Sequence, residues 1–529
     1  MPDALIPEPA ASPDQSRGFA RSASIIALGN IASRLLGLVR DRVKGHYFGS
    51  SGAVSAYESA VIIPVTIYDL LIGGLVSSAL VPVFSEYLAR GERDELWRLV
   101  GTLLAVLTGL MAIFVVAVQI GAPAIANFMA PDYSPALHEL LVRLLRVLVF
   151  GLFFMSLAAV LSGLLYALQR FTLPTFTAAL FNLGIIVAAL LLHERLGVAS
   201  LAVGLLLGAA LQVAVQIPGL RGTQLRLGLN WRHPGLRQIG RLYLPIILGL
   251  VISNASVVIS TRLINSTGER SFAWNDYATS LMQFPLGLVV TAVSVAILPT
   301  LSRQAVTSPL DFKATLAQGL RLVLALIIPA VAGMILLAPA ITALVYQSGA
   351  FTPADVGIVS LVLRVQMVGV FFAAIDQPLI FACYARKDTL TPALVGVACV
   401  GLYLAVALII SRLRPLTLLD LVAANDAQLA AHAIVMLRLF YRRQGGFADR
   451  SVWITFVRGL LAAAGMAFLA AAAWFGINRL GLAPGLAQRL LSVAVPGAVG
   501  LIAYFWLAER LQISELGQAI SLVRQRFKL

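Results

Sequence analysis

The sequence predicts an all-α polytopic membrane protein with about fourteen transmembrane helices. Of its 529 residues, 59% are hydrophobic and only 12% are charged, whereas a soluble domain carries about 25% charged residues. Residues 99–131, 196–220 and 322–354 contain no Asp, Glu, Lys or Arg. Each of these runs is longer than the ~20 apolar residues that a helix needs to cross a bilayer.

The expected helices are apolar runs that end at charged residues, glycine or proline. In chain order they are 20–48, 53–88, 95–125, 135–167, 174–193, 197–218, 236–264, 271–304, 311–345, 354–385, 390–411, 417–443, 452–479 and 485–510. The second run is long, and we expect it to break near Gly73 and Gly74 because glycine weakens a helix.

Lysine and arginine gather in alternate loops between these helices. Since cytoplasmic loops carry the excess of positive charge, both termini are expected in the cytoplasm, and the chain in the bacterial inner membrane. The net charge of +15 comes mostly from residues beside apolar runs. This placement indicates contact with anionic lipids, and no compact basic domain points to nucleic acid.

Both ends of the chain differ from the apolar region between them. Residues 1–19 begin with a polar, proline-rich stretch that lacks the apolar centre of a signal peptide, so we expect a disordered cytoplasmic tail. Residues 511–529 place apolar side chains at helical spacing beside basic ones. This pattern favours an amphipathic helix on the cytoplasmic leaflet, and a frayed basic tail is an equal alternative.

The chain resembles itself at a nearly fixed offset. Residues 79–85 (ALVPVFS) are echoed by 296–302 (AILPTLS), and the YA and TLP of 166–174 are echoed by the YA and TLTP of 384–392. The echoes predict an N-terminal six-helix lobe over 20–218, a cytoplasmic loop over 219–235, a C-terminal six-helix lobe over 236–443 and two further helices over 452–510. Lobes related in this way are typical of transporters that bind substrate between them and work by alternating access.

The first helix carries a polar face. Asn30, Arg34, Gly37, Asp41 and Lys44 recur at the spacing of one side of an α-helix. An arginine near the bilayer centre costs at least about 2.5–3.5 kcal/mol, so this face is expected to line a hydrated cavity.

Arg40 forms an adjoining strip on the same helix. Arginine suits an anion such as phosphate, because its planar guanidinium donates paired hydrogen bonds. The alternative is that Arg34 pairs with Asp41 and serves only to set the orientation of the helix in the membrane.

Other candidates have weaker signals. Asp69 is interpreted as a counter-ion for a cavity arginine, and Arg262 as a cation contributed by the other lobe. Asp388 is a possible ion-coupling carboxylate, with a helix N-cap as the favoured alternative. The histidines show no zinc-site spacing and no nucleotide-binding loop occurs, so neither an enzyme nor a metal or other cofactor is expected.

Three passages resemble one known family. They are 33–41 (SRLLGLVRD), 169–182 (QRFTLPTFTAALFN) and 281–302, which opens with LMQFPLG and closes with ILPTLS. Their order and spacing resemble the lipid II flippases of the MurJ (or MviN) type, within the multidrug/oligosaccharidyl-lipid/polysaccharide (MOP) exporter superfamily. The resemblance extends over nearly the whole chain.

The resemblance implies movement of lipid II, a lipid-linked peptidoglycan precursor, to the outer leaflet for cell-wall synthesis and cell shape. It also implies that Arg34, Arg40 and Asp41 hold the pyrophosphate and that 452–510 forms a groove for the lipid tail. The chain departs from the family pattern where it has Tyr68 and Ser280, because the family carries arginines there.

Three functions are therefore carried forward. The first is lipid II flipping, driven by membrane potential or by a coupling cation that the sequence does not identify. The second is export of another polyprenyl-pyrophosphate-linked glycan, which the departures at Tyr68 and Ser280 leave open. The third is a non-transporting scaffold for cell-wall synthesis.

Overall fold

The computed structural model is built from helices, with no strand in the residues it describes. These residues are 13–71, 74–224, 228, 230–447, 450–480, 483, 485–513, 515 and 517. The expected C-terminal amphipathic helix therefore falls mostly outside the described residues. α1 begins at Pro13, so residues 13–19, which were expected to be disordered, are helical.

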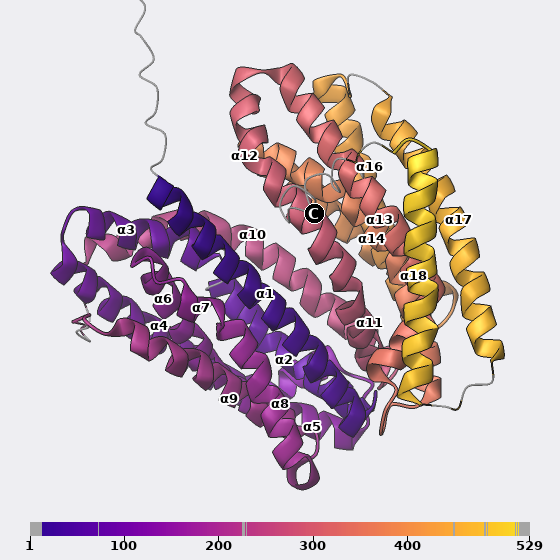
Figure 1. The fold of residues 1–529 in the computed structure, drawn as a ribbon. Helices are drawn as coiled ribbons and strands as arrows, with labels where there is room; N and C mark the ends of the chain where they lie inside the picture. The colour runs from indigo at the N-terminus through magenta and orange to yellow at the C-terminus, as the bar shows by residue number, and fades with distance from the viewer. Residues whose placement is uncertain are drawn as a thin grey trace, which may run out of the picture. The chain divides into compact units, whose positions relative to one another are not determined.

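The helices follow one another with short connections (Figure 1). The first ten are α1 (Pro13–Phe48), α2 (Gly52–Leu71), α3 (Val81–Ala89), α4 (Arg93–Met129), α5 (Pro135–Leu148), α6 (Gly151–Ala167), α7 (Thr172–Thr175), α8 (Thr177–Leu196), α9 (Ala199–Gln216) and α10 (Pro234–Asn265). The remainder are α11 (Ser271–Pro285), α12 (Thr291–Thr307), α13 (Pro309–Tyr346), α14 (Pro353–Ala385), α15 (Leu390–Leu413), α16 (Leu418–Gln444), α17 (Ser451–Arg479) and α18 (Leu486–Arg510).

The all-α membrane fold predicted from composition is confirmed. Twelve helical stretches of the described residues are long and apolar enough to cross a membrane. The long helices α1 and α10 are not among the twelve; in α1, five charged residues fall within 34–44. The chain is thus a multi-pass membrane protein, and the count of fourteen spans stays a prediction.

Several expected helices are interrupted. The second ends at Leu71 and resumes at the π-helical turn η1 (Val76–Leu80), close to Gly74, whose φ of +79° suits glycine. The run 135–167 breaks between α5 and α6, where Gly151 packs closely on Leu205 of α9. The run 271–304 contains a second π-helical turn, η3 (Leu286–Val290).

Contacts divide the chain into two compact units. The first comprises Met1–Lys44 and Ala56–Val258, and the second comprises Gly45–Ser55 and Ile259–Leu529. The tip between α1 and α2 belongs to the second unit because it is hydrogen-bonded there. Ser50 Oγ donates to Asp355 at 2.6 Å, and Tyr277 Oη donates to the Gly49 carbonyl at 2.9 Å. The boundaries of the two lobes predicted from the repeat stay a prediction.

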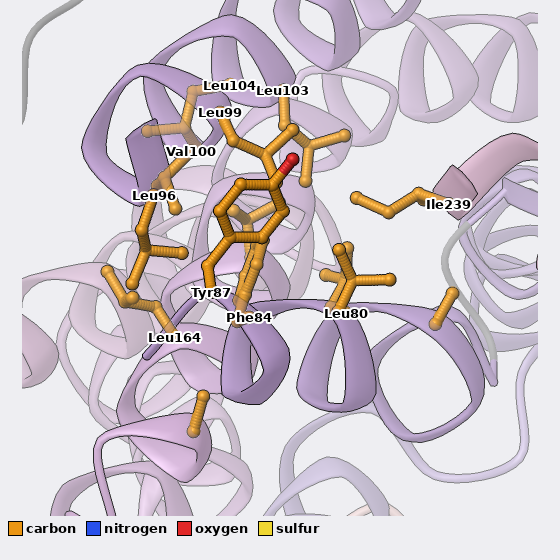
Figure 2. Close-up of a cluster of buried hydrophobic side chains, with 14 of the residues drawn as sticks. Leu80, Phe84, Tyr87, Leu96, Leu99, Val100, Leu103, Leu104, Leu164 and Ile239 are labelled. Carbon is orange, nitrogen blue, oxygen red and sulfur yellow. The ribbon is translucent and has the colours of Figure 1, made fainter. Parts of the chain in front are cut away.

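Both copies of the repeated sequence motif lie in hydrophobic cores. In the first unit, Leu80 and Phe84 are fully buried among side chains of α4, together with Leu164 of α6 and Ile239 of α10 (Figure 2). In the second unit, Leu301 is fully buried in a cluster with residues of α13, α14 and α16. The motif recurs because each unit uses it to fill its own core.

Two helix pairs pack side by side, α8 with α9 and α17 with α18 (Figure 1). In the first pair, a Cβ at Gly184 would lie 2.4 Å from the Cα of Gly208. Small residues let membrane helices approach this closely. In the second unit, Tyr504 of α18 donates to the Ala325 carbonyl of α13 at 2.6 Å.

We expect Gly184→Ala to lower the free energy of unfolding by about 1–3 kcal/mol, because the added methyl group meets backbone atoms that cannot rotate away. Gly109 of α4 is the matched control, since a Cβ there meets no atom within 4 Å. Gly109→Ala is expected to be neutral or to stabilise by up to ~1 kcal/mol. Thermal unfolding in detergent measures both, and equal melting temperatures would contradict the packing argument.

Candidate functional site

Arg40 is held in the first unit by two neighbours. Its Nε and Nη2 donate to Asp41 Oδ1 at 3.0 and 2.8 Å, and its Nη1 donates to Asn182 Oδ1 of α8 at 3.0 Å. A guanidinium has five N–H groups, so two stay available to a ligand. The Arg40 side chain is 31% exposed, which leaves part of its edge accessible.

Asp41 joins Arg40 to a second cation. Lys44 Nζ lies 3.6 Å from Asp41 Oδ1 and 2.5 Å from Glu58 Oε1 of α2. Asp41 and Lys44 are 2% and 1% exposed, so each is ionised only with the other charges in place. The sequence placed Lys44 on a face expected to line a hydrated cavity, whereas the structure buries its side chain.

Asn182 anchors α8 to α1. Its Nδ2 donates to the Ser33 carbonyl at 3.2 Å, while its Oδ1 accepts from Arg40. A Cβ at Gly37 would lie 3.8 Å from Asn182 Nδ2, so Gly37 lies directly beside this amide. The sequence offered one signal that was not used: Asn182 is a lone amide in an apolar run.

The four charges of this network cancel, since Arg40 and Lys44 balance Asp41 and Glu58. Arg34 and Asn30 lie further along α1, and both are exposed. Arg34 therefore adds a further cation to α1, about 9 Å along the helix axis from Arg40. This arrangement suits an anionic ligand with several acceptor oxygens.

The two weaker candidates, Asp69 and Arg262, lie on other helices. Asp69 is partly buried in α2 and forms no ion pair with an arginine in the described part of the chain. Arg262 is partly buried in the segment of α10 that belongs to the second unit. Their cavity roles stay predictions.

Asp388 begins the turn before α15. Its carboxylate accepts from the Thr391 backbone at 2.9 Å and from the Thr391 hydroxyl at 2.7 Å, and Arg443 Nη1 donates to it at 3.1 Å. The Thr391 hydrogen bonds and Arg443 hold the pKa of Asp388 below its usual range. Asp388 thus accepts hydrogen bonds at the start of α15 from the position before the N-cap, which is Thr389. The role of Asp388 in ion coupling stays a prediction.

Comparisons with known proteins agree with the sequence resemblance. The family model of lipid II flippase MurJ matches residues 44–493. A protein of Vibrio cholerae named probable lipid II flippase MurJ is 31% identical over 72% of this chain and 75% of its own length. A Haemophilus influenzae protein of the same name is 29% identical over 85% of this chain and 91% of its own length.

Solved structures show the same fold. A structure described as lipid II flippase MurJ in an inward closed conformation superposes with a TM-score of 0.76 at 22% identity, covering 92% of this chain and 99% of its own. An inward-facing multidrug resistance MATE transporter of the MOP superfamily gives 0.69 at 14% identity, covering 78% and 94%. From the match of its sequence over residues 44–493, we conclude that the chain belongs to the lipid II flippase MurJ family.

Proposed function

We propose that the chain is a lipid II flippase, which moves the lipid-linked peptidoglycan precursor from the cytoplasmic to the outer leaflet by alternating access. The observation that carries the proposal is the Arg40 guanidinium, which is fixed by Asp41 and Asn182 while two of its N–H groups stay available. Relatives named lipid II flippase at 27–31% identity support the cargo.

The chemistry of the cargo fits this site. A pyrophosphate presents several anionic oxygens to a planar donor, and fixing the donor beforehand reduces the entropy lost on binding. We propose that Arg34 and Arg40 contact the pyrophosphate, and that Asp41, Asn30 and Gly37 shape the site around it. Asp69 and Arg262 are proposed as further members of the site.

The direction of transport follows from charge. An inside-negative potential favours outward movement of an anion by about 2.3 kcal/mol per charge per 100 mV. We propose cytoplasmic termini and contact of the basic loops with anionic lipids, because positive charge gathers in alternate loops. We further propose that α17 and α18, which pack on α13, provide the groove for the lipid tail.

Complementation tests the cargo. In a strain depleted of its own lipid II flippase, the chain is expected to restore growth and cell shape. Tyr68 and Ser280 replace arginines expected from the family, so the alternative cargo is another polyprenyl-pyrophosphate-linked glycan. Failure to complement, together with movement of such a glycan in vesicles, would favour this alternative, and failure of both would favour a scaffold.

Arg40→Ala is expected to reduce the rate of lipid II movement in proteoliposomes at least about tenfold, because charge-assisted hydrogen bonds contribute about 1.5–3 kcal/mol each. Arg40→Lys should also be impaired, because an ammonium cannot bridge Asp41 and Asn182 as a planar guanidinium does. The rate is measured by the accessibility of lipid II to an external modifying enzyme.

Arg98→Ala is the matched control for this experiment. Arg98 of α4 pairs with Glu95 at 2.7 Å on an exposed surface, where such pairs contribute little. The control should retain the unmodified rate. Equal rates of lipid II movement for Arg40→Ala and Arg98→Ala would show that Arg40 does not bind the cargo.

Lys44→Met is expected to destabilise the chain by about 3–5 kcal/mol, because it leaves Asp41 and Glu58 with less compensating charge in a buried place. Adding Glu58→Gln should recover part of the loss, since it removes one of the two uncompensated charges. Thermal unfolding of the single and double variants measures the coupling between them. If the losses in the free energy of unfolding from the two single substitutions add up in the double variant, the 2.5 Å contact between Lys44 and Glu58 contributes nothing.

A further inference from the structure

The second unit buries a strip of polar side chains that the proposed cargo site does not use. α14 carries Gln366 and Asp376, α16 carries Asp426 and His432, and the two helices pack along each other. Gln366 is 5% exposed, and the two aspartates are 7% exposed each. Carboxylates this deeply buried are rare unless they are paired.

Asp426 is the least compensated member. Its carboxylate lies against the backbone of Gly369, where a Cβ would come within 2.2 Å of Oδ1. Among the described residues, neither carboxylate oxygen accepts a hydrogen bond of good geometry, although the Gly369 backbone N–H approaches the carboxylate. An ionised carboxylate in such a place pays a large desolvation cost, and uptake of a proton removes that cost.

Asp376 is partly compensated. Its Oδ2 lies 2.7 Å from His432 Nδ1, and His432 Nε2 lies 3.3 Å from the Pro392 carbonyl. The Asp376 Oδ1 atom has no hydrogen-bond partner, and neither does Gln366 Oε1, although Gln366 Nε2 donates to Asn275 and Thr279 of α11.

In the described residues, three carboxylate oxygens and one amide oxygen of this strip lack a donor, while the ring nitrogen Nδ1 of His432 contacts Asp376 alone. The strip therefore holds more acceptor oxygens than donors. Gly369, which Asp426 contacts, and Asp376 are seven residues apart, about 10 Å along the helix axis. In the part of the chain that the structure describes, no three His, Cys, Asp or Glu side chains gather closely enough to hold a metal ion. A proton, which needs only one carboxylate, fits this spacing.

We propose that the strip between α14 and α16 is a proton-binding site, with Asp426 as the principal acceptor and the Asp376–His432 pair as the second. The proposal includes coupling of this protonation to cargo movement. The coupling rests on the proposed function. The proton adds to a carboxylate oxygen and leaves again to water. No other bond is made or broken.

Neighbouring groups define the surroundings of the strip. The titratable groups that interact electrostatically with Asp376 are Cys383 and Tyr384 on α14, Cys399 on α15 and His432 on α16, while α11 contributes the neutral Asn275 and Thr279. Leu379 and Met436, about one helical turn beyond Asp376 and His432, line a cavity of about 330 Å³. Three charged residues also line this cavity, namely Arg386, Asp388 and Arg443.

Infrared spectroscopy of the full chain in lipid vesicles tests the binding site. On titration, the unmodified chain should show the absorption of a protonated carboxyl group, and Asp426→Asn should remove it. Asp388→Asn is the matched control and should keep the band, because Asp388 is satisfied by Thr391 and Arg443. Any residual band in Asp426→Asn should disappear when Asp376→Asn is added. A band of unchanged intensity in Asp426→Asn would overturn the proposal, as would a band that disappears on adding sodium ions at constant pH.

A second experiment tests coupling in proteoliposomes loaded with lipid II. For each coupled proton, a gradient of one pH unit should change the steady-state ratio between the leaflets about tenfold. Asp426→Asn should lose this response and still flip lipid II under an imposed potential. An equal response in the variant would overturn coupling. If the unmodified chain moves no lipid II, the proposed function fails, while the infrared result stands separately.

Asp426→Asn keeps the size of the side chain, and its melting temperature shows whether it folds. A second variant, His432→Gln, removes the partner of Asp376 and leaves Asp426 in place. It should retain the titrating band of Asp426. Loss of that band in a folded His432→Gln variant would contradict the assignment of Asp426 as the principal acceptor.

Discussion

The candidate site depends on the burial of charge around Asp41. This carboxylate is 2% exposed and lies between Arg40 and Lys44, and Lys44 in turn needs Glu58. Removing one member of such a group leaves another charge buried without compensation, which costs more than the pair contributes when intact. The charged side chains of the site are therefore compensated only while α1 packs against α2 and α8.

The sequence predicted the helices well because the bilayer itself sets their length. Hydrocarbon requires about twenty apolar residues for each span and satisfied backbone hydrogen bonds throughout. The breaks were harder to predict. The break at Gly74 left a signal in the sequence, whereas the end of α5 before Gly151 depends on the approach of Leu205 from α9, which no local pattern reveals.

The sequence predicted only part of the site, because a local pattern shows which residues share a helix face but not which helices pack together. Helical periodicity placed Arg34 and Asp41 on one face of α1, with Arg40 beside it, because all three belong to a single helix. Glu58 and Asn182 come from other helices, and their contacts with Lys44 and Arg40 exist only after packing. His432 likewise looked like one of several scattered histidines, until the fold placed it 2.7 Å from Asp376.

The Arg40 network of the first unit and the α14–α16 strip of the second unit differ in which hydrogen-bonding groups lack a partner. In the first unit the charges of the network cancel, and Arg40 keeps donors to spare beside the positive Arg34. In the second unit the described atoms of the α14–α16 strip without a hydrogen-bond partner are three carboxylate oxygens, one amide oxygen and the ring nitrogen Nδ1 of His432, which lies 2.7 Å from Asp376. Unused N–H donors favour the binding of an anion, whereas acceptor oxygens without a donor favour the binding of a proton or another cation. A transporter that exchanges an anionic headgroup for a proton needs two such sites of opposite preference.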